Sequence, residues 1–382
     1  MKSKTLKSKL TQAAFAALAA ALLLAGLPVN ARVALLPAYT IEDLGGFGGA
    51  DARAYGINSS GQVAGYSMNS GGFHRAFRFT DGGGLLDLGA IRGSAYSNAV
   101  AVNDHGQVAG NGDHHPGSGD YTPFRYTDNV GVKDLGTLPG HYASIATGIN
   151  NHGAVVGESV VIPPATLTRA FRYTDGAGMQ DLGTLGGSRT SAQGINDRGE
   201  VVGWAQTPTT QVNDPWRIGH AFLYTDCFGM QDLNNLIGPN TGWELIKASA
   251  INGRGQIVGY GERNGNLRAF LYDSQTHAVK NLGTFPNGGI SYALALNHGG
   301  DVVGAAYLDA SGVGNYRAMI YTNQLGMQNL NNLIAPNSGW LLRVATGIND
   351  DGQIVGWGEY QGQVHAFRLT PRACRDVPGI GG

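Results

Sequence analysis

The chain has 382 residues, of which 61 are glycine, and only 14% of its residues are charged. Apolar residues make up 42% of the chain, which is enough for a large core and excludes wholesale disorder. The formal net charge of −1 excludes a strongly basic nucleic-acid-binding protein.

The first residues have the pattern of a secretory signal peptide. An apolar run from Ala13 to Leu27 follows four lysines, and Val29 and Ala31 place small side chains where a signal peptidase requires them. The lysines are Lys2, Lys4, Lys7 and Lys9. We expect residues 1–31 to be removed, a mature chain that begins near Arg32, and a secreted protein, either extracellular or periplasmic. A retained membrane anchor is the alternative, and no later stretch approaches the roughly 20 apolar residues of a membrane span.

Internal repetition dominates the rest of the sequence. Seven segments share a pattern of the type GINSSGQVAG, which begins at Gly56, and they recur 45 to 56 residues apart. Their asparagines are Asn58, Asn103, Asn150, Asn196, Asn252, Asn297 and Asn349. After each asparagine comes an aromatic segment such as Arg75–Phe77, and in six repeats a DLG-like segment such as Asp87–Gly89 follows. A period of this length is typical of repeat architectures.

Each repeat predicts four short strands, which we name a to d. Strand a ends at the Ile-Asn pair, strand b is the Val-Val-Gly run, strand c the Ala-Phe-Arg-Tyr-Thr run and strand d the Met-Gln-Asp-Leu run. In each a–b turn, asparagine occupies the first position and glycine the fourth, as in a type I turn whose glycine takes a positive φ. The second glycine, such as Gly65, lies inside strand b, and we expect it where neighbouring sheets approach closely.

Four strands per unit at this period predict an all-β fold, a seven-bladed β-propeller with four short antiparallel strands per blade. A β-solenoid is the alternative. The last repeat lacks its strand d, and the segment Tyr39–Gly45 has the sequence of one, so we expect the N-terminal strand to complete the last blade and close the ring. A single propeller domain would occupy residues 32–374, followed by a flexible C-terminal tail over residues 375–382.

The His-Ala-Phe triplets at His220 and His365 are further repeat signatures, together with DLGTLGG at Asp181 and GINDRGEVVG at Gly194. With these segments the chain resembles the HAF-type extracellular repeat family. The resemblance covers about residues 39–370 and implies a secreted bacterial protein of propeller-like character, with no activity assigned to any residue.

The propeller geometry carries two further expectations. Strand c contains Pro123 in the second repeat and Met319 in the sixth, and we expect these blades to be less regular, since proline removes a backbone donor. Cys227 and Cys374 follow strand c in repeats that lie three blades apart, so we expect no disulfide bond between them.

Motifs for catalysis or cofactor binding are nearly absent. There is no G-x-S-x-G, H-E-x-x-H, Walker or EF-hand pattern, and no cofactor is predicted. One weak metal-site candidate lies in the b–c loop of the second repeat and comprises Asp113, His114, His115 and Asp120. Carboxylates and imidazoles are metal ligands, but adjacent residues point apart in an extended chain, so the sequence favours a solvated loop. His220 and His365 stand where other repeats carry arginine or threonine, which indicates packing or surface roles.

The candidate ligand-binding residues come from the connections of variable length. Two long d–a connections, Leu233–Trp243 and Leu330–Trp340, predict a short helical turn followed by a tryptophan that either plugs a blade junction or contacts a ligand. The b–c and d–a connections emerge on one face of a propeller, and variable loops on a rigid scaffold often bind ligands. The predicted binding residues on this face are Trp216, Arg217, Trp243, Trp340, His115 and Tyr142.

The sequence favours a secreted, monomeric binding protein over an enzyme, with a carbohydrate (a glycan) or another secreted or surface protein as its partner. One alternative is a secreted propeller enzyme, a hydrolase or lyase whose titratable groups meet at the mouth of the central channel. The other is a structural protein of the cell surface. Neither a nucleic-acid partner nor a membrane span is predicted.

Overall fold

The structure, a computed structural model, describes residues 38–91, 94–113, 120–161, 167–210, 218–310 and 314–372. The predicted signal peptide and the predicted C-terminal tail lie outside these residues.

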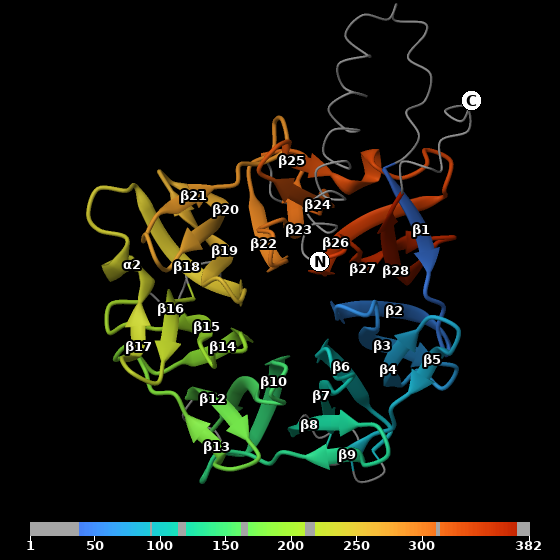
Figure 1. Ribbon diagram of the computed structural model, residues 1–382, viewed down its shortest axis with the longest axis horizontal. Coiled ribbons are helices and arrows are strands. Elements are labelled where there is room, and N and C mark those ends of the chain that lie inside the picture. The colour runs from blue at the N-terminus through green and yellow to red at the C-terminus, as the bar shows by residue number, and fades with distance from the viewer. Residues whose placement is uncertain are drawn as a thin grey trace, which may run out of the picture.

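Short antiparallel strands dominate the described chain and form small sheets around a common axis (Figure 1). Five of the sheets contain four consecutive strands each, in the predicted order a, b, c, d. Their strands are β6 (Ser97–Val102), β7 (Val108–Asp113), β8 (Tyr121–Thr127) and β9 (Gly131–Asp134); β10 (Ala143–Ile149), β11 (Val155–Val160), β12 (Thr168–Thr174) and β13 (Gly178–Asp181); β14 (Thr190–Ile195), β15 (Val201–Ala205), β16 (His220–Thr225) and β17 (Gly229–Asp232); β18 (Trp243–Ile251), β19 (Gln256–Arg263), β20 (Asn266–Asp273) and β21 (Val279–Asn281); and β22 (Ser291–Leu296), β23 (Val302–Tyr307), β24 (Tyr316–Thr322) and β25 (Gly326–Asn329).

The two ends of the chain form the remaining sheet, which has eight strands. It consists of two four-stranded groups that a single parallel pair, Asp51 opposite Val364, joins. The first group is β2 (Gly48–Ile57), β3 (Val63–Asn69), β4 (His74–Thr80) and β5 (Gly84–Asp87). The second group is β26 (Trp340–Ile348), β27 (Ile354–Tyr360), β28 (Gln363–Pro371) and β1 (Tyr39–Asp43).

The N-terminal strand completes the last group, which confirms the predicted pairing. β1 runs antiparallel to β28, from Tyr39 opposite Pro371 to Asp43 opposite Phe367. Tyr39 and Ile41 also pack against the apolar core of this group. The first strand of the described chain therefore occupies the strand-d position of the last blade, where it covers an edge that would otherwise be free.

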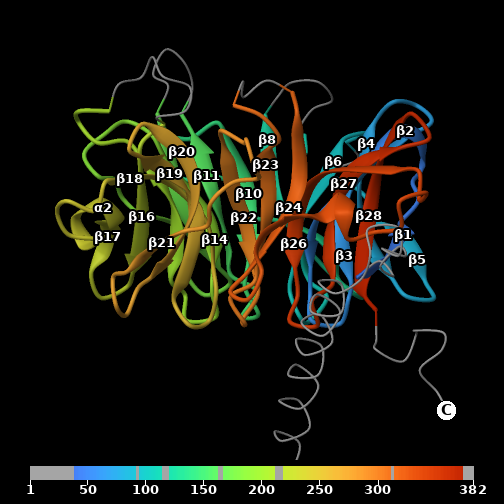
Figure 2. The same ribbon diagram turned by 90° about the horizontal axis from the view of Figure 1, so that it is seen from above.

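A ring of four-stranded sheets with strand a at the axis is a β-propeller. Figure 2 shows the ring edge-on, with the strands running between its two faces. We call the face that carries the a–b and c–d turns, such as Asn58–Gly61, the turn face. The opposite face, with the b–c and d–a connections, is the loop face.

The second glycine of each repeat lies where strand b passes strand a of the same sheet. A Cβ on Gly157 would stand 1.9 Å from the carbonyl oxygen of Ile145 and 2.9 Å from the ring of Phe171. Strand a bulges at this point, between Ala146 and Gly148. The expected close approach therefore occurs within one blade and not between neighbouring sheets, because the bulge brings a strand-a carbonyl against strand b.

The two repeats that depart from the pattern keep regular sheets, so the expectation of less regular blades is wrong. β8, with Pro123, and β24, with Met319, pair with their strand-b neighbours without a register shift. In three other blades the N–H at the position of Pro123 donates to a hydroxyl of the next blade, as Ala76 does to Ser97 at 3.0 Å. Proline therefore removes no bond of the strand ladder. Met319 is fully buried in the place of a phenylalanine ring, since its flexible thioether fills the same space.

The seven repeat asparagines form a closed cycle of hydrogen bonds on the turn face. Each buried side-chain Nδ2 donates to the main-chain carbonyl of the next repeat asparagine at 2.9 to 3.4 Å, and Asn349 donates to Asn58. Each Oδ1 accepts the N–H four residues later in its own turn. The asparagine therefore shapes its turn, as predicted, and also joins neighbouring blades, which the sequence analysis did not anticipate.

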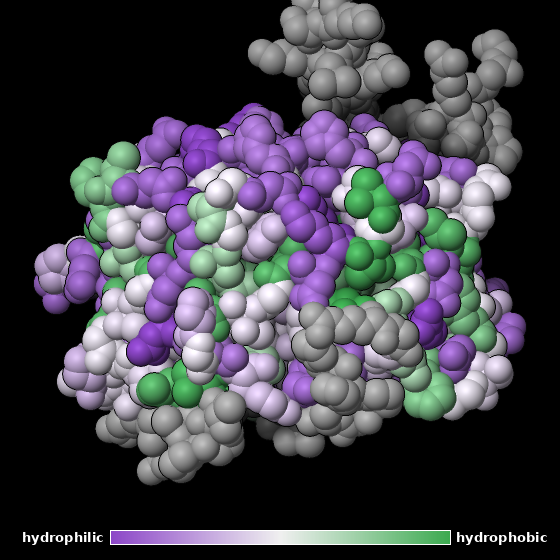
Figure 3. All heavy atoms as spheres, turned by 90° about the horizontal axis from the view of Figure 1, so that it is seen from below, coloured by the Kyte–Doolittle hydropathy of each residue, from purple (hydrophilic) through white to green (hydrophobic). Residues whose placement is uncertain are grey.

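Short helical turns occupy the two long d–a connections, as predicted: α2 (Leu233–Leu236) and the 3-10 turn η3 (Leu330–Asn332). Within the described ranges, no helix is long and apolar enough to span a membrane. Cys227 is an exposed, free cysteine, whereas Cys374 lies outside the described residues. On the side of the rim that Figure 3 shows, hydrophilic side chains are interspersed with separate patches of hydrophobic ones.

Candidate functional site

The turn face has a hollow of about 320 Å³ at the axis, lined by the seven asparagine turns. Three carboxylates lie in its lining, and each accepts a main-chain N–H from the preceding turn. Asp104 accepts from Ser59 at 2.9 Å, Asp197 from Asn151 at 2.8 Å and Asp350 from His298 at 2.7 Å. Burial acts against ionisation of Asp104, but the hydrogen bonds from Ser59 and Asn151 lower its pKa. These carboxylates thus join blades.

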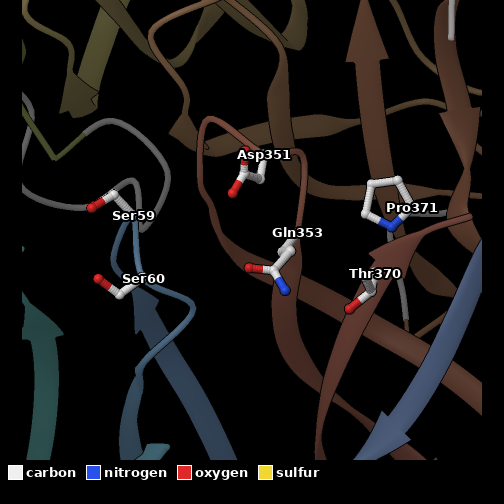
Figure 4. Close-up of a pocket in the computed structure, with 6 residues that line it drawn as sticks. All are labelled: Ser59, Ser60, Asp351, Gln353, Thr370 and Pro371. Carbon is white, nitrogen blue, oxygen red and sulfur yellow. The ribbon is translucent and has the colours of Figure 1, made fainter. Parts of the chain in front are cut away.

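A second hollow, of about 430 Å³, opens on the turn face between the first and the last blade. Figure 4 shows the side chains of Asp351 and Gln353 between the two serines of the first a–b turn and the end of β28. Its lining residues are Ser59, Ser60, Asp351, Gln353, Thr370 and Pro371. Gln353 Oε1 accepts Asn349 Nδ2 at 2.8 Å, so this wall also belongs to the asparagine cycle.

Part of the predicted site lies outside the described residues, namely Trp216, Arg217, His114 and His115. Of the weak metal candidates, Asp113 is buried at the end of β7, opposite Tyr121 in β8, and Asp120 immediately precedes that strand. Among the residues that the structure describes, no group of three or more metal-ligating side chains is found.

Trp243 and Trp340 are half-buried, and each packs against the core of its own blade. Trp243 meets Phe270 edge-on at 6.2 Å, and Trp340 stacks on Tyr360 at 4.8 Å. This packing supports the plug alternative over a ligand contact. Tyr142, by contrast, is exposed at the start of the third repeat on the loop face.

Aromatic side chains form a continuous run across the loop-face part of the ring. Neighbouring ring centroids, or an arginine and a ring, lie 4.2 to 6.4 Å apart along it. We call this run the aromatic arc, and its members in order are Tyr260, Tyr292, Tyr307, Tyr316, Trp357, Arg53, Tyr66, His74, Tyr96 and Tyr121. All members except the buried Tyr66 are partly exposed.

Three of these rings lie at strand ends on the loop face. Tyr307 ends a strand b, whereas Tyr316 and Tyr121 begin strand c, and in this fold both positions border the b–c connection. The arc extends over five blades, from the β18–β21 blade through the junction of the last and first blades to the β6–β9 blade. It therefore presents a curved row of flat apolar rings with phenol hydroxyls, the surface chemistry that sugars and peptides bind.

One ion pair lies at the middle of the arc. Arg53 binds both oxygens of Asp51 at 3.0 Å, and the Tyr66 hydroxyl lies 3.2 Å from the same carboxylate. Burial raises the pKa of Tyr66 far above the ordinary value, and it raises the pKa of Tyr260 and of Tyr96 to about 12. These phenols are therefore neutral hydrogen-bonding groups at physiological pH.

Lys247 is a half-buried cation beside the arc. It lies in β18 opposite Tyr260, and burial lowers its pKa while Glu158 in β11 acts in the opposite direction. In the part of the chain that the structure describes, its ammonium makes no hydrogen bond or ion pair. A lysine in such a setting can act as a base or as a nucleophile.

The arc was not among the residues predicted from the sequence, although the repeats contain a signal for it. Two positions of the repeat vary strongly in residue type: the fifth residue before each repeat asparagine, in strand a, and the residue directly after the second glycine, in strand b. These two positions pair across the strands, as Arg53 with Tyr66 and Lys247 with Tyr260 show. The adjacent positions nearer the turn keep one residue type throughout, namely the alanine four residues before each asparagine and the second glycine itself. Variation at a fixed position inside a uniform scaffold indicates residues that the fold does not require.

No family model and no curated protein sequence matches the chain. Several solved structures do match. An oligogalacturonate lyase in complex with manganese aligns with a TM-score of 0.59 and 11% identity, over 88% of this chain and 97% of that chain. An oligogalacturonate lyase from Vibrio parahaemolyticus aligns with a TM-score of 0.54 and 9% identity, over 88% and 95%. The β-propeller domain of the Trilobed protease from Pyrococcus furiosus aligns with a TM-score of 0.54 and 10% identity, over 86% and 100%. At these identities the likeness shows the β-propeller fold alone.

Proposed function

We propose that this chain is a secreted, seven-bladed β-propeller that binds an oligosaccharide along the aromatic arc of its loop face. The observation that carries the proposal is the continuous aromatic arc, whose rings are partly exposed except for Tyr66 and whose neighbouring members lie at most 6.4 Å apart. Sugars present apolar C–H faces that stack on such rings, and the phenol hydroxyls are neutral donors for sugar oxygens. The arc thus replaces Trp243 and Trp340 as the centre of the site.

The blade count rests on the asparagine cycle. Seven turn asparagines bond head to tail, and the last returns to the first, which supports one blade per repeat. The proposed location outside the cytoplasm rests on the sequence pattern of residues 1–31 and on the resemblance to the HAF-type extracellular repeat.

The direct test is calorimetric titration with galactotriose and with trigalacturonate, a neutral and an acidic trisaccharide. The double variant Tyr307→Ala/Tyr316→Ala removes two neighbouring rings of the arc and should weaken binding roughly tenfold, since ring contacts contribute about 0.5–1.5 kcal/mol each. Phe228→Ala is the matched control, because Phe228 is an exposed aromatic residue in a c–d turn on the opposite face. Equal affinities for wild type and both variants would refute the proposal.

A propeller enzyme is the second candidate function, and Lys247 is the observation that favours it. Its pKa is lowered by burial, and it lies beside Tyr260 in the arc. Among the structural neighbours are oligogalacturonate lyases and an acylaminoacyl peptidase, although their identities support the fold alone. Under this alternative Lys247 acts as the general base on a bound substrate. Lys247→Met should then abolish product formation from trigalacturonate while binding persists. If wild type forms no product, this alternative fails and the binding function remains.

A further inference from the structure

In four blades, the residue two positions before the recurring aromatic residue of strand c pairs with the acid of the DLG segment. Arg75 forms a two-point ion pair with Asp87, with Nε to Oδ2 at 3.1 Å and Nη2 to Oδ1 at 3.2 Å. The other pairs are Arg169–Asp181, His220–Asp232 and His365–Asp43. In the two arginine pairs, the contact neutralises a cation at the loop-face end of strand c.

Two adjacent blades lack this acid but keep the arginine. In the β18–β21 blade Arg268 faces strand d with Asn281, and in the β22–β25 blade Arg317 faces strand d with Asn329. Within the described residues, these arginines form hydrogen bonds only with main-chain carbonyls. Arg268 donates to the carbonyls of Leu267 and Gly289, and Arg317 donates to the carbonyl of Tyr316 at 2.9 Å. Neither guanidinium therefore has a carboxylate partner among the described residues.

The asparagine at this position keeps one of the two interactions of the aspartate, the hydrogen bond from the main-chain N–H two residues later. Asn281 Oδ1 accepts the N–H of Gly283 at 3.0 Å, just as Asp87 Oδ1 accepts that of Gly89 at 2.8 Å. With that oxygen engaged, the side-chain Nδ2 stands where aspartate places its second oxygen. At the position where the β2–β5 blade has the Arg75–Asp87 ion pair, these two blades thus have hydrogen-bond donors on both strands, the guanidinium on strand c and the asparagine Nδ2 on strand d.

The charged surroundings of the two arginines differ only slightly. Burial lowers the pKa of Arg268, and no charged neighbour contributes. Burial also lowers the pKa of Arg317, with Arg343 adding to the effect and Glu359 acting against it. Glu359 is itself engaged by Arg343 at 2.6 Å. Both guanidinium groups remain protonated at any physiological pH, since arginine titrates above about 12.

We propose that Arg268 with Asn281 and Arg317 with Asn329 are two binding positions for ligand carboxylates, so that the oligosaccharide of the loop face is a uronic acid oligomer. The inference rests on the proposed function and names its substrate class. A carboxylate is favoured because the same arginine position already holds one, bidentately, in the β2–β5 blade. Two positions on adjacent blades match an oligomer with repeated acidic units.

Both positions border the aromatic arc. The Arg343 guanidinium lies 5.9 Å from the ring centroid of Tyr316 and also acts on the pKa of Arg317. The Gly289 carbonyl that Arg268 contacts lies two residues before β22, the strand that carries Tyr292. Rings of the arc can therefore hold sugar faces while the adjacent arginines hold the carboxylates of the same chain.

The test compares two double variants by titration with trigalacturonate and galactotriose. Asn281→Asp/Asn329→Asp restores the two missing acids and should weaken trigalacturonate binding at least about tenfold, because a charge-assisted pair with the ligand is lost. Galactotriose binding should not change. The control, Arg75→Gln/Arg169→Gln, alters the net charge by the same two units but removes arginines that are already neutralised, and should leave both affinities near wild type.

Three outcomes overturn the inference: equal losses in both double variants, no loss in the first variant, or tighter binding of galactotriose than of trigalacturonate by wild type. Binding of galactotriose that Tyr307→Ala/Tyr316→Ala weakens would leave the proposed function standing while the acidic class fails. Melting temperatures of all variants establish that each is folded.

Discussion

Replacing Arg368 with leucine should weaken the junction that closes the ring. The side chain of Arg368 in β28 is only 7% exposed and reaches three segments. Its Nη1 donates to the Gly61 carbonyl of the first blade at 3.0 Å, while Nε and Nη2 bind Glu42 of β1 at 3.1 and 2.7 Å. Nη2 also binds Asp81 in the first c–d turn. One residue therefore links the last blade to both N-terminal segments.

The size of the effect follows from the groups left behind. Gly61 is buried, and its carbonyl would lose its donor, which costs about 1–3 kcal/mol. Glu42 and Asp81 are 45% and 69% exposed, so water replaces the lost ion pairs and each adds at most about 1 kcal/mol. The sum is about 1–5 kcal/mol. Leucine itself fits, because other blades carry Leu223 and Leu271 at this position.

Apolar residues can sometimes replace a buried ion pair without loss of stability. The junction between the blade of Leu223 and the next blade shows that this requires another donor for the glycine carbonyl. There the glycine carbonyl of the next turn, Gly255, accepts the N–H of Ser274 at 3.1 Å instead of an arginine. Gly61 has no such substitute among the described residues, so the cost should persist.

Urea unfolding measures the change in the free energy of unfolding, with Arg78→Leu as the matched control. Arg78 makes the same contact with Gly106 and Asp128 but binds no residue of β1. Amide exchange should therefore accelerate in Tyr39–Asp43 in Arg368→Leu and stay unchanged there in Arg78→Leu. An Arg368→Leu protein as stable as wild type, with β1 still protected, would refute the reasoning.

Three further outcomes are expected. Asn349→Ala should lose about 1–3 kcal/mol in urea unfolding, because it removes the acceptor of the Gln353 N–H, takes away one of the two donors to the Asn58 carbonyl and opens the asparagine cycle. Gly157→Ala should lose about 3 kcal/mol or fail to fold, since a Cβ would lie 1.9 Å from a carbonyl oxygen, whereas Gly176→Ala, with nothing within 4 Å, should be neutral by the same assay. The hydrogen bond with Asp232 raises the pKa of His220, so the stability lost in His220→Gln should be full below about pH 6.5 and vanish as the pH rises through the folded-state pKa, in unfolding curves measured from pH 5 to 9.

The strands, the turns and the ring closure could be predicted because each depends on local chemistry that the chain repeats. Asparagine and glycine fix every a–b turn, and the glycine φ values, such as 78° at Gly61, are positive as expected. The missing strand d in the last repeat identified β1 as its substitute. These features can be predicted without knowing which side chains from different blades contact one another.

The contacts between blades could not be predicted in the same way. The bond from Asn58 to the carbonyl of Asn103 joins residues of two repeats, and turn chemistry alone already explained the asparagine. The sequence left two roles open for Trp340, a plug of the blade junction and a ligand contact. Its stacking on Tyr360 supports the plug, since the exposure of a ring depends on its partner ring. The aromatic arc likewise depends on neighbours from different blades.

The arginine–asparagine pairs show why an irregular repeat position can indicate function. Asn281 preserves the hydrogen bond to Gly283 that the turn requires, so the exchange of aspartate for asparagine leaves the local fold intact. The ion pair that it removes would have been half-exposed, like Arg75–Asp87, and would have added about 1 kcal/mol or less. The exchange of aspartate for asparagine therefore changes the free energy of unfolding only slightly. It does, however, leave the positive charge of the arginine without a negative partner at the surface.

This reasoning predicts a gain of binding from Asp87→Asn. The introduced asparagine should keep the bond to the Gly89 N–H and release Arg75, which follows the arc residue His74, as a third carboxylate position. Trigalacturonate affinity should then rise up to about tenfold, measured by calorimetric titration. Asp181→Asn is the control, because it frees Arg169 in the β10–β13 blade, which the arc does not reach. An equal rise in both variants would show that only net charge matters, and no rise in either would contradict the assignment of carboxylates to the strand-c arginines.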